Sequence, residues 1–284
     1  MNIPAAMTFC ALAVTLGAAV ADTTQSSAPP KVARSSLFEA RPGDVLEDAG
    51  VMVVSGGTRP RSETFEVVRR ADGDRVVTGI IEAADGAWRV EGRWAYDDTN
   101  RALSATGTGR YGNRPVSIEI VDVGAIAEIT ATVRGETQRD EAPCEPCLMD
   151  LAPSILPIFT MTRLYDAAVG GTQRFHWVGH DLLRDQVLTN GQVAIRLLGT
   201  ETVQLPDGRE LAVTRYAFNE PMADEPMADE TGGRTTVRLN CNLYVDADNR
   251  PLGFATPLAV GMRRGFEALP KLLPPVLDTP AAGR

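Results

Sequence analysis

The stretch WRVEGRWAY (88–96) decides the fold class, because apolar and charged positions alternate along it. One face carries large apolar side chains and a glycine, at Trp88, Val90, Gly92, Trp94 and Tyr96. The other face is charged, with Arg89, Glu91 and Arg93. A period of two belongs to a β-strand with one buried face. The stretch therefore predicts a half-buried strand.

Turn signals surround this strand at short spacing: ADGD (71–74), ADGA (84–87) and DDTN (97–100). Asp, Asn and Gly tolerate the positive φ angles that tight hairpins require. The sequence thus predicts an antiparallel meander. Its expected strands are 63–70, 75–83, 88–96, 101–109, 115–122 and 125–134.

The hydrophobic period changes at SILPIFTMTRLYDAAVGG (154–171), which predicts a helix. Ser154 can cap it, Pro157 suits its first turn, and the glycine pair at 170–171 can end it. Strand patterns resume afterwards. We therefore predict a mainly all-β fold, a curved antiparallel sheet or open β-barrel with one packed α-helix between two strand blocks.

The N-terminal segment MNIPAAMTFCALAVTLGAAVA (1–21) predicts a cleaved export signal, because its apolar stretch is short and ends in Ala-Val-Ala. We expect no membrane span elsewhere and a periplasmic or secreted bacterial protein, in a compartment where disulfides persist. The remaining expected boundaries are a disordered linker at 22–36, a single β-rich domain at 37–273 and a disordered tail at 274–284.

The net charge of −9 argues against a nucleic-acid partner, which would require basic patches. Cysteine usage is informative instead. In EAPCEPCLMD (141–150), Cys144 and Cys147 are favoured as a structural disulfide that fixes the entry to the helix. Cys241 alternates with apolar residues in VRLNCNLYV, which predicts a buried free thiol.

Two alternatives remain for the cysteine pair. The motif Cys-x-Pro-Cys occurs in thioredoxin-like redox proteins, where a strand leads directly into it. Here the polar stretch ETQRDEAP (136–143) precedes the motif and predicts a loop. The second alternative is a zinc site formed by Cys144, Cys147, His176 and His180. If RFHWVGH is a strand, however, the two histidines lie roughly 13 Å apart at about 3.3 Å per residue. We therefore expect no cofactor, with zinc as the alternative.

No Gly-x-Ser-x-Gly or His-Glu-x-x-His motif occurs in the chain, which argues against the corresponding hydrolases. Any histidine-dependent catalysis would use His176 or His180, with Asp181 close enough in sequence to orient one of them. Four aromatic residues are candidates either for core packing or for lining a lipid-sized cavity, depending on whether the helix fills the concavity. They are Trp88, Trp94, Tyr96 and Trp177.

Three stretches in order resemble a family of exported proteobacterial proteins known mainly as a domain of unknown function. They are APSILPIFTMTRLY (152–165), GTETVQLPDGRELAVTRYAF (199–218) and LYVDADNRPLGF (243–254). Members are similar in architecture to periplasmic lipoprotein carriers, whose open β-barrel is lidded by helices and holds acyl chains. The resemblance implies a fold more than a function.

From these observations we expect a periplasmic carrier or binding protein for a hydrophobic, lipid-like ligand. Burial of an acyl chain contributes roughly 0.8 kcal/mol per CH₂, so an apolar concavity binds without special chemistry. The alternatives are a cell-envelope enzyme with a site in the concavity using His176 or His180, and an envelope assembly factor that binds protein partners.

Overall fold

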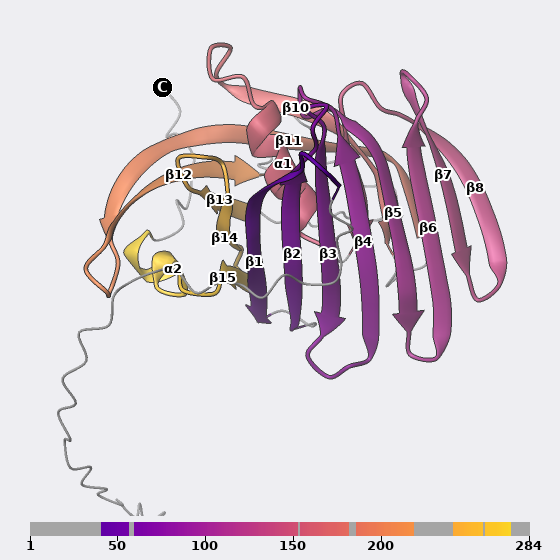
Figure 1. Ribbon diagram of the computed structural model, residues 1–284, viewed down its shortest axis with the longest axis horizontal. Coiled ribbons are helices and arrows are strands. Elements are labelled where there is room, and N and C mark those ends of the chain that lie inside the picture. The colour runs from indigo at the N-terminus through magenta and orange to yellow at the C-terminus, as the bar shows by residue number, and fades with distance from the viewer. Residues whose placement is uncertain are drawn as a thin grey trace, which may run out of the picture. The chain divides into compact units, whose positions relative to one another are not determined.

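The computed structural model describes residues 41–56, 60–152, 154–181, 186–218, 241–257 and 259–273. The predicted export signal, the linker and the C-terminal tail lie outside the described residues. The described residues form a single 15-stranded sheet, curved into a nearly closed barrel, with two short helices (Figure 1). The predicted fold class is confirmed.

The first half of the chain is a run of strands. These are β1 (Val45–Gly56), β2 (Arg61–Arg69), β3 (Arg75–Ala83), β4 (Trp88–Tyr96), β5 (Ala102–Tyr111), β6 (Arg114–Asp122), β7 (Ile126–Val133) and β8 (Glu136–Pro143). The second half contains β9 (Cys147–Ala152), α1 (Leu156–Leu164), β10 (Thr172–Asp181), β11 (Gln186–Gln204), β12 (Glu210–Phe218), β13 (Cys241–Val245), β14 (Pro251–Ala255), β15 (Ala259–Arg263) and α2 (Leu269–Leu272).

The strand order is β8 back to β1, then β15 back to β9. The first and last strands of the chain, β1 and β15, pair antiparallel, and this pairing joins the two halves. The ends of the sheet are β8 and β9, which follow one another in the chain. All pairs are antiparallel except β9 with β10, which are parallel and connected through α1.

The predicted meander agrees with β2–β7, and β4 has the predicted bounds and alternating burial. The prediction for ETQRDEAP was wrong, because this stretch forms strand β8 rather than a loop. All of its residues except Ala142 are exposed to solvent. An exposed edge strand rich in charge needs no apolar alternation, so the period-two signal is missing.

Helix α1 is shorter than the predicted 154–171. It ends at Tyr165, whose backbone is extended, and the Asp166 carboxylate accepts a hydrogen bond from the backbone N–H of Ala168 at 2.8 Å. Such a local side-chain bond offers the backbone an alternative to the helix. Gly170 and Gly171 have positive φ, but they lie in the turn that follows.

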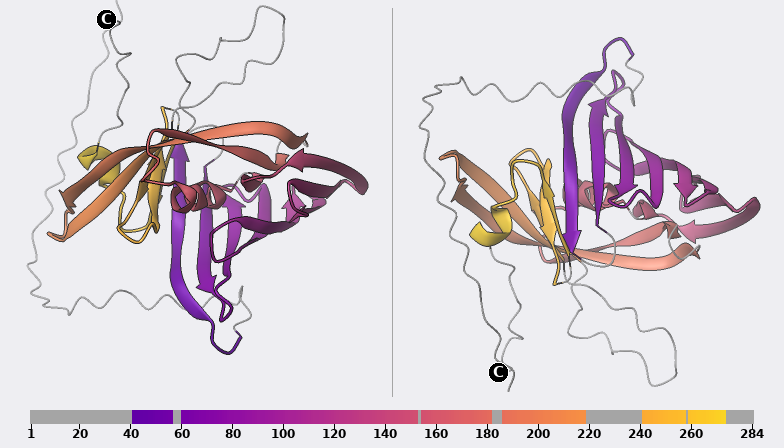
Figure 2. Two further views of the ribbon diagram at one scale, coloured as in Figure 1. Left: turned by 90° about the horizontal axis from the view of Figure 1, so that it is seen from above. Right: turned by 90° about the horizontal axis from the view of Figure 1, so that it is seen from below.

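Helix α1 lies inside the curved sheet, between the strands of the first half and β10–β12 (Figure 2). Its buried residues include Leu156, Phe159 and Met161, which belong to the same core cluster as the inner faces of both halves. A second, smaller core packs α2 against β11–β15. In this structure the helix fills the concavity of the sheet.

A row of glycines makes room for this packing. Gly79, Gly92 and Gly107 are aligned neighbours on β3, β4 and β5. A Cβ atom on Gly92 would lie 2.5 Å from the Trp94 ring, and one on Gly79 would lie 2.9 Å from Leu156 Cδ1. The missing side chains form a trough on the inner face. The Trp94 indole and α1 pack into it.

We predict that Gly92→Ala lowers the free energy of unfolding by about 1–3 kcal/mol, because the new methyl group overlaps the buried indole of Trp94. Gly107→Ala is the matched control. Its Cβ would lie 3.1 Å from the terminal Cδ1 of Leu151, a contact that a small shift can relieve. Urea unfolding of both variants measures the difference. Equal stability of Gly92→Ala and the wild type would contradict this packing.

Candidate functional site

The aromatic residues singled out in the sequence lie in two different environments. Trp88, Trp94 and Tyr96 are 4%, 1% and 3% exposed and pack in the core that contains α1. Trp177 of β10 is half-buried at the edge of the same core. Its ring centroid lies 6.3 Å from that of Phe218. In the structure these side chains pack against protein, with the helix occupying the space beside them.

The interior also holds polar groups. The indole N–H of Trp177 donates a hydrogen bond to the Asp150 carboxylate, with Nε1 3.1 Å from Oδ2. Asp150 lies in β9 and is buried. Burial raises the pKa of the Tyr96 hydroxyl, the negative charge of Asp150 raises it further, and a hydrogen bond to Thr160 opposes both effects. Tyr96 therefore remains neutral at physiological pH, and it can act there only as a neutral hydrogen-bonding group.

The histidine candidates lie four residues apart on one strand. His176 is half-buried, and its backbone N–H donates to the carbonyl oxygen of Pro146 at 3.1 Å. His180 is fully buried. Both belong to β10, where a four-residue separation corresponds to roughly 13 Å. The side chain of Asp181 lies outside the described residues. The strand thus keeps the two imidazoles from acting on one substrate atom or one metal ion.

The structure joins Cys144 and Cys147 by a disulfide, with their Cα atoms 4.5 Å apart. The bond links the end of β8 to the start of β9, the two edge strands of the sheet. The expectation that it fixes the entry to the helix was wrong, because β9 separates Cys147 from α1. It constrains the boundary between the two strand blocks instead.

The structure also bears on the two alternatives for these cysteines. A strand does lead into the motif and a parallel β-α-β unit follows, contrary to expectation. The cysteines are nevertheless only 1% and 2% exposed, whereas thiol exchange requires an accessible sulfur. Within the described part of the chain, no group of three or more His, Cys, Asp or Glu side chains is arranged to hold a metal ion.

Glu63 was missed in the sequence and is the most unusual residue of the interior. It lies in β2, and its side chain is completely buried. The backbone N–H of Ile155 donates to both carboxylate oxygens at 3.0 Å, and the Ser154 hydroxyl donates to Oε2 at 3.1 Å. Arg61 Nε donates to Oε1 at 3.2 Å.

This carboxylate holds the beginning of α1, because Ile155 is the N-cap residue of the helix. A negative charge at this position interacts favourably with the helix dipole and with unpaired backbone N–H groups. The sequence contains a pattern that could have identified Glu63. In SETFEVV (62–68), Glu63 occupies the same face as Phe65 and Val67, which is the apolar face of the strand. A charge there indicates a buried polar contact.

The pKa of Glu63 is raised, because burial disfavours the charged carboxylate. Arg61 and the donors from Ile155 and Ser154 oppose this effect but do not overcome it. The folded protein therefore binds the Glu63 proton more tightly than the unfolded chain does. The stabilisation from this proton is fully present below the ordinary pKa of 4.5 and is lost as pH rises through the folded-state pKa.

We predict that the wild type loses stability relative to Glu63→Gln as pH rises above 4.5. The difference should change by about 1.4 kcal/mol per pH unit between the unfolded and folded pKa values, because glutamine does not titrate. Urea unfolding of both proteins across this pH range measures it. A gap that stays constant, or that moves in favour of the wild type, would show that the pKa is not raised.

A second prediction concerns Cys241, which is buried in β13 as expected. Burial raises the pKa of its thiol to about 12. We expect the Cys241 peptide to remain unmodified when folded protein is treated with iodoacetamide at mildly alkaline pH, since almost no thiolate is present. The same peptide should react completely in urea, which serves as the control. Rapid modification of the folded protein would place Cys241 at the surface.

No helix in the described part of the chain has the length and apolar character needed to cross a membrane. No family model matches the chain, and no curated protein matches it. Among solved structures, the chain is similar to a DUF1089 family protein from Pseudomonas aeruginosa, with a TM-score of 0.37 and 11% sequence identity. The match covers 78% of this chain and 94% of the other. The likeness concerns the fold, and no argument about function rests on it.

Proposed function

We propose that the protein is a carrier or binding protein for a hydrophobic, lipid-like ligand in the bacterial periplasm or outside the cell. The observation that carries the proposal is the extended apolar inner face of the curved sheet, on which α1 packs (Figure 2). The helix is a separate short element inside the sheet, and its apolar side chains occupy the space that an acyl chain would need. A ligand would bind by taking the place of these side chains against the inner face.

The energetic balance sets a minimum ligand size. Displacing the buried side chains of Leu156, Phe159 and Met161 costs about 1.5–3 kcal/mol each, or about 5–9 kcal/mol together. An acyl chain recovers about 0.8 kcal/mol for each buried CH₂. About six to eleven methylene groups are therefore needed to offset the displacement. Long-chain lipids satisfy this condition, and short-chain acids do not.

The edge strands β8 and β9 stand at opposite ends of the hydrogen-bonded order, so strand pairing does not close the barrel. A disulfide at this boundary suits an oxidising compartment, in agreement with the predicted export signal. A binding protein requires no catalytic group. This is compatible with β10, which keeps His176 and His180 apart.

We predict that the purified, delipidated protein binds palmitate but not butyrate, with laurate intermediate, because the two methylene groups of butyrate cannot offset the displacement of α1. Displacement of a fluorescent fatty acid measures the three affinities. Equal affinity for all chain lengths, or no binding of palmitate, would contradict the proposal.

A variant that loosens α1 sharpens this test. Ser154→Ala removes the hydroxyl that donates to Glu63 and accepts from the backbone N–H of Leu156 at 3.2 Å. Loss of such a capping group costs about 0.5–2 kcal/mol. If α1 must move, palmitate should bind about 2- to 20-fold more tightly. The exposed Ser117→Ala is the matched control and should bind like the wild type. Weaker binding by Ser154→Ala would show that α1 does not compete with the ligand.

A further inference from the structure

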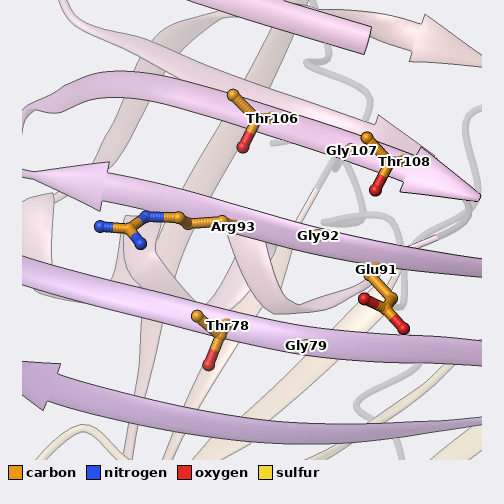
Figure 3. A pocket seen from close by; sticks show the side chains of 8 residues that line it. All are labelled: Thr78, Gly79, Glu91, Gly92, Arg93, Thr106, Gly107 and Thr108. Atoms are coloured by element: carbon orange, nitrogen blue, oxygen red, sulfur yellow. The ribbon is translucent and has the colours of Figure 1, made fainter. Parts of the chain in front are cut away.

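A polar pocket of about 180 Å³ lies on the outer face of the sheet, across β3, β4 and β5. It sits behind the glycine row, on the face opposite Trp94 and α1. Figure 3 shows Arg93 extending along β4 and Glu91 pointing from β4 toward β3, with Thr78 on one side of β4 and Thr106 and Thr108 on the other. The side chains around it are Thr78, Glu91, Arg93, Thr106 and Thr108.

Thr78 is the first sign that this pocket accepts a ligand. The residue is only 6% exposed, and its hydroxyl has no hydrogen-bond partner among the residues that the structure describes. A buried polar group left without a partner destabilises the folded state. A ligand atom in the pocket that pairs with this hydroxyl would remove this destabilisation.

Arg93 is the second sign. It is exposed, and none of the described ion pairs involves its guanidinium group. Partial burial of the guanidinium lowers the pKa of Arg93, and the neighbouring charges of Arg70 and Arg41 lower it further. Two of its charged neighbours have partners of their own, because Arg70 contacts Asp44 at 2.6 Å and Glu91 contacts Arg89 at 3.1 Å. Glu66, the cross-strand neighbour of Thr78, also lies on this face. Arg93 is the cation at this end of the pocket that no described carboxylate pairs.

We propose that this pocket binds a small molecule through a phosphate or carboxylate group, held by the Arg93 guanidinium and the Thr78 hydroxyl. Arginine and hydroxyl donors match the acceptor oxygens of such groups. The pocket volume of about 180 Å³ suits a phosphate-sized group rather than a long acyl chain. The inference does not depend on the proposed function, because the lipid would bind on the other face.

The first test is calorimetric titration of the full chain with inorganic phosphate. We expect saturable binding that Arg93→Gln weakens at least about tenfold, because a charge-assisted hydrogen bond is lost. Thr78→Val should weaken it about 3- to 10-fold, whereas Thr78→Ser, which keeps the hydroxyl, should bind like the wild type. Arg139→Gln is the charge-matched control, since Arg139 is exposed on the distant edge strand β8.

A second arm identifies the source of the group. Vesicles containing phosphatidylglycerol replace free phosphate in a flotation assay with the same variants. Binding to vesicles alone, lost in Arg93→Gln but retained in Arg139→Gln, would support the site with a lipid headgroup as its ligand. No saturable binding in either arm would overturn the proposal. Equal losses for the two arginine variants, or for Thr78→Val and Thr78→Ser, would overturn it as well, with thermal unfolding showing that each variant is folded.

Discussion

The contact between the Glu63 carboxylate and the beginning of α1 is the constraint on which the interior depends. Glu63 places a buried carboxyl group in β2, and the backbone N–H of Ile155 and the hydroxyl of Ser154 pair with it. Removing one partner of such a contact leaves an uncompensated group in the core, which is strongly destabilising. The contact therefore fixes where the helix enters the concavity, and the glycine row determines how closely the helix approaches the sheet.

Strands β3, β4 and β5 provide different environments on their two faces. On the inner face, Gly79 and Gly92 leave a trough that Leu156 and the Trp94 indole fill. On the outer face, the threonines and Arg93 form a polar pocket behind these glycines. Alternation along a strand separates the two environments. The proposed acyl-chain site and the proposed phosphate or carboxylate site are consequently independent, and a substitution on one face can be tested without altering the other.

Patterns of period two and turn residues were sufficient to predict the meander, because each strand buries one face and its turns have local chemistry. They failed for β8, whose side chains other than that of Ala142 face solvent, and for β9, in which residues 147–151 are all buried whichever face they occupy. The pairing of β1 with β15 depends on contacts distant in sequence, which periodicity does not encode. The role of Glu63 was overlooked for the same reason, since Ser154 and Ile155, at the beginning of α1, lie about ninety residues away from it. His176 and His180 were predicted to share a strand, and that strand separates them.

The most direct test of the proposed carrier function compares two masses of the protein after its export to the periplasm of a Gram-negative host. One is the native mass, and the other is the mass after denaturation without reductant. The proposed carrier function predicts a native mass larger by one lipid, with the excess lost on denaturation. The denatured chain should be lighter by two hydrogens because of the Cys144–Cys147 disulfide. Equal native and denatured masses, together with failure to take up palmitate when it is added, would contradict the account.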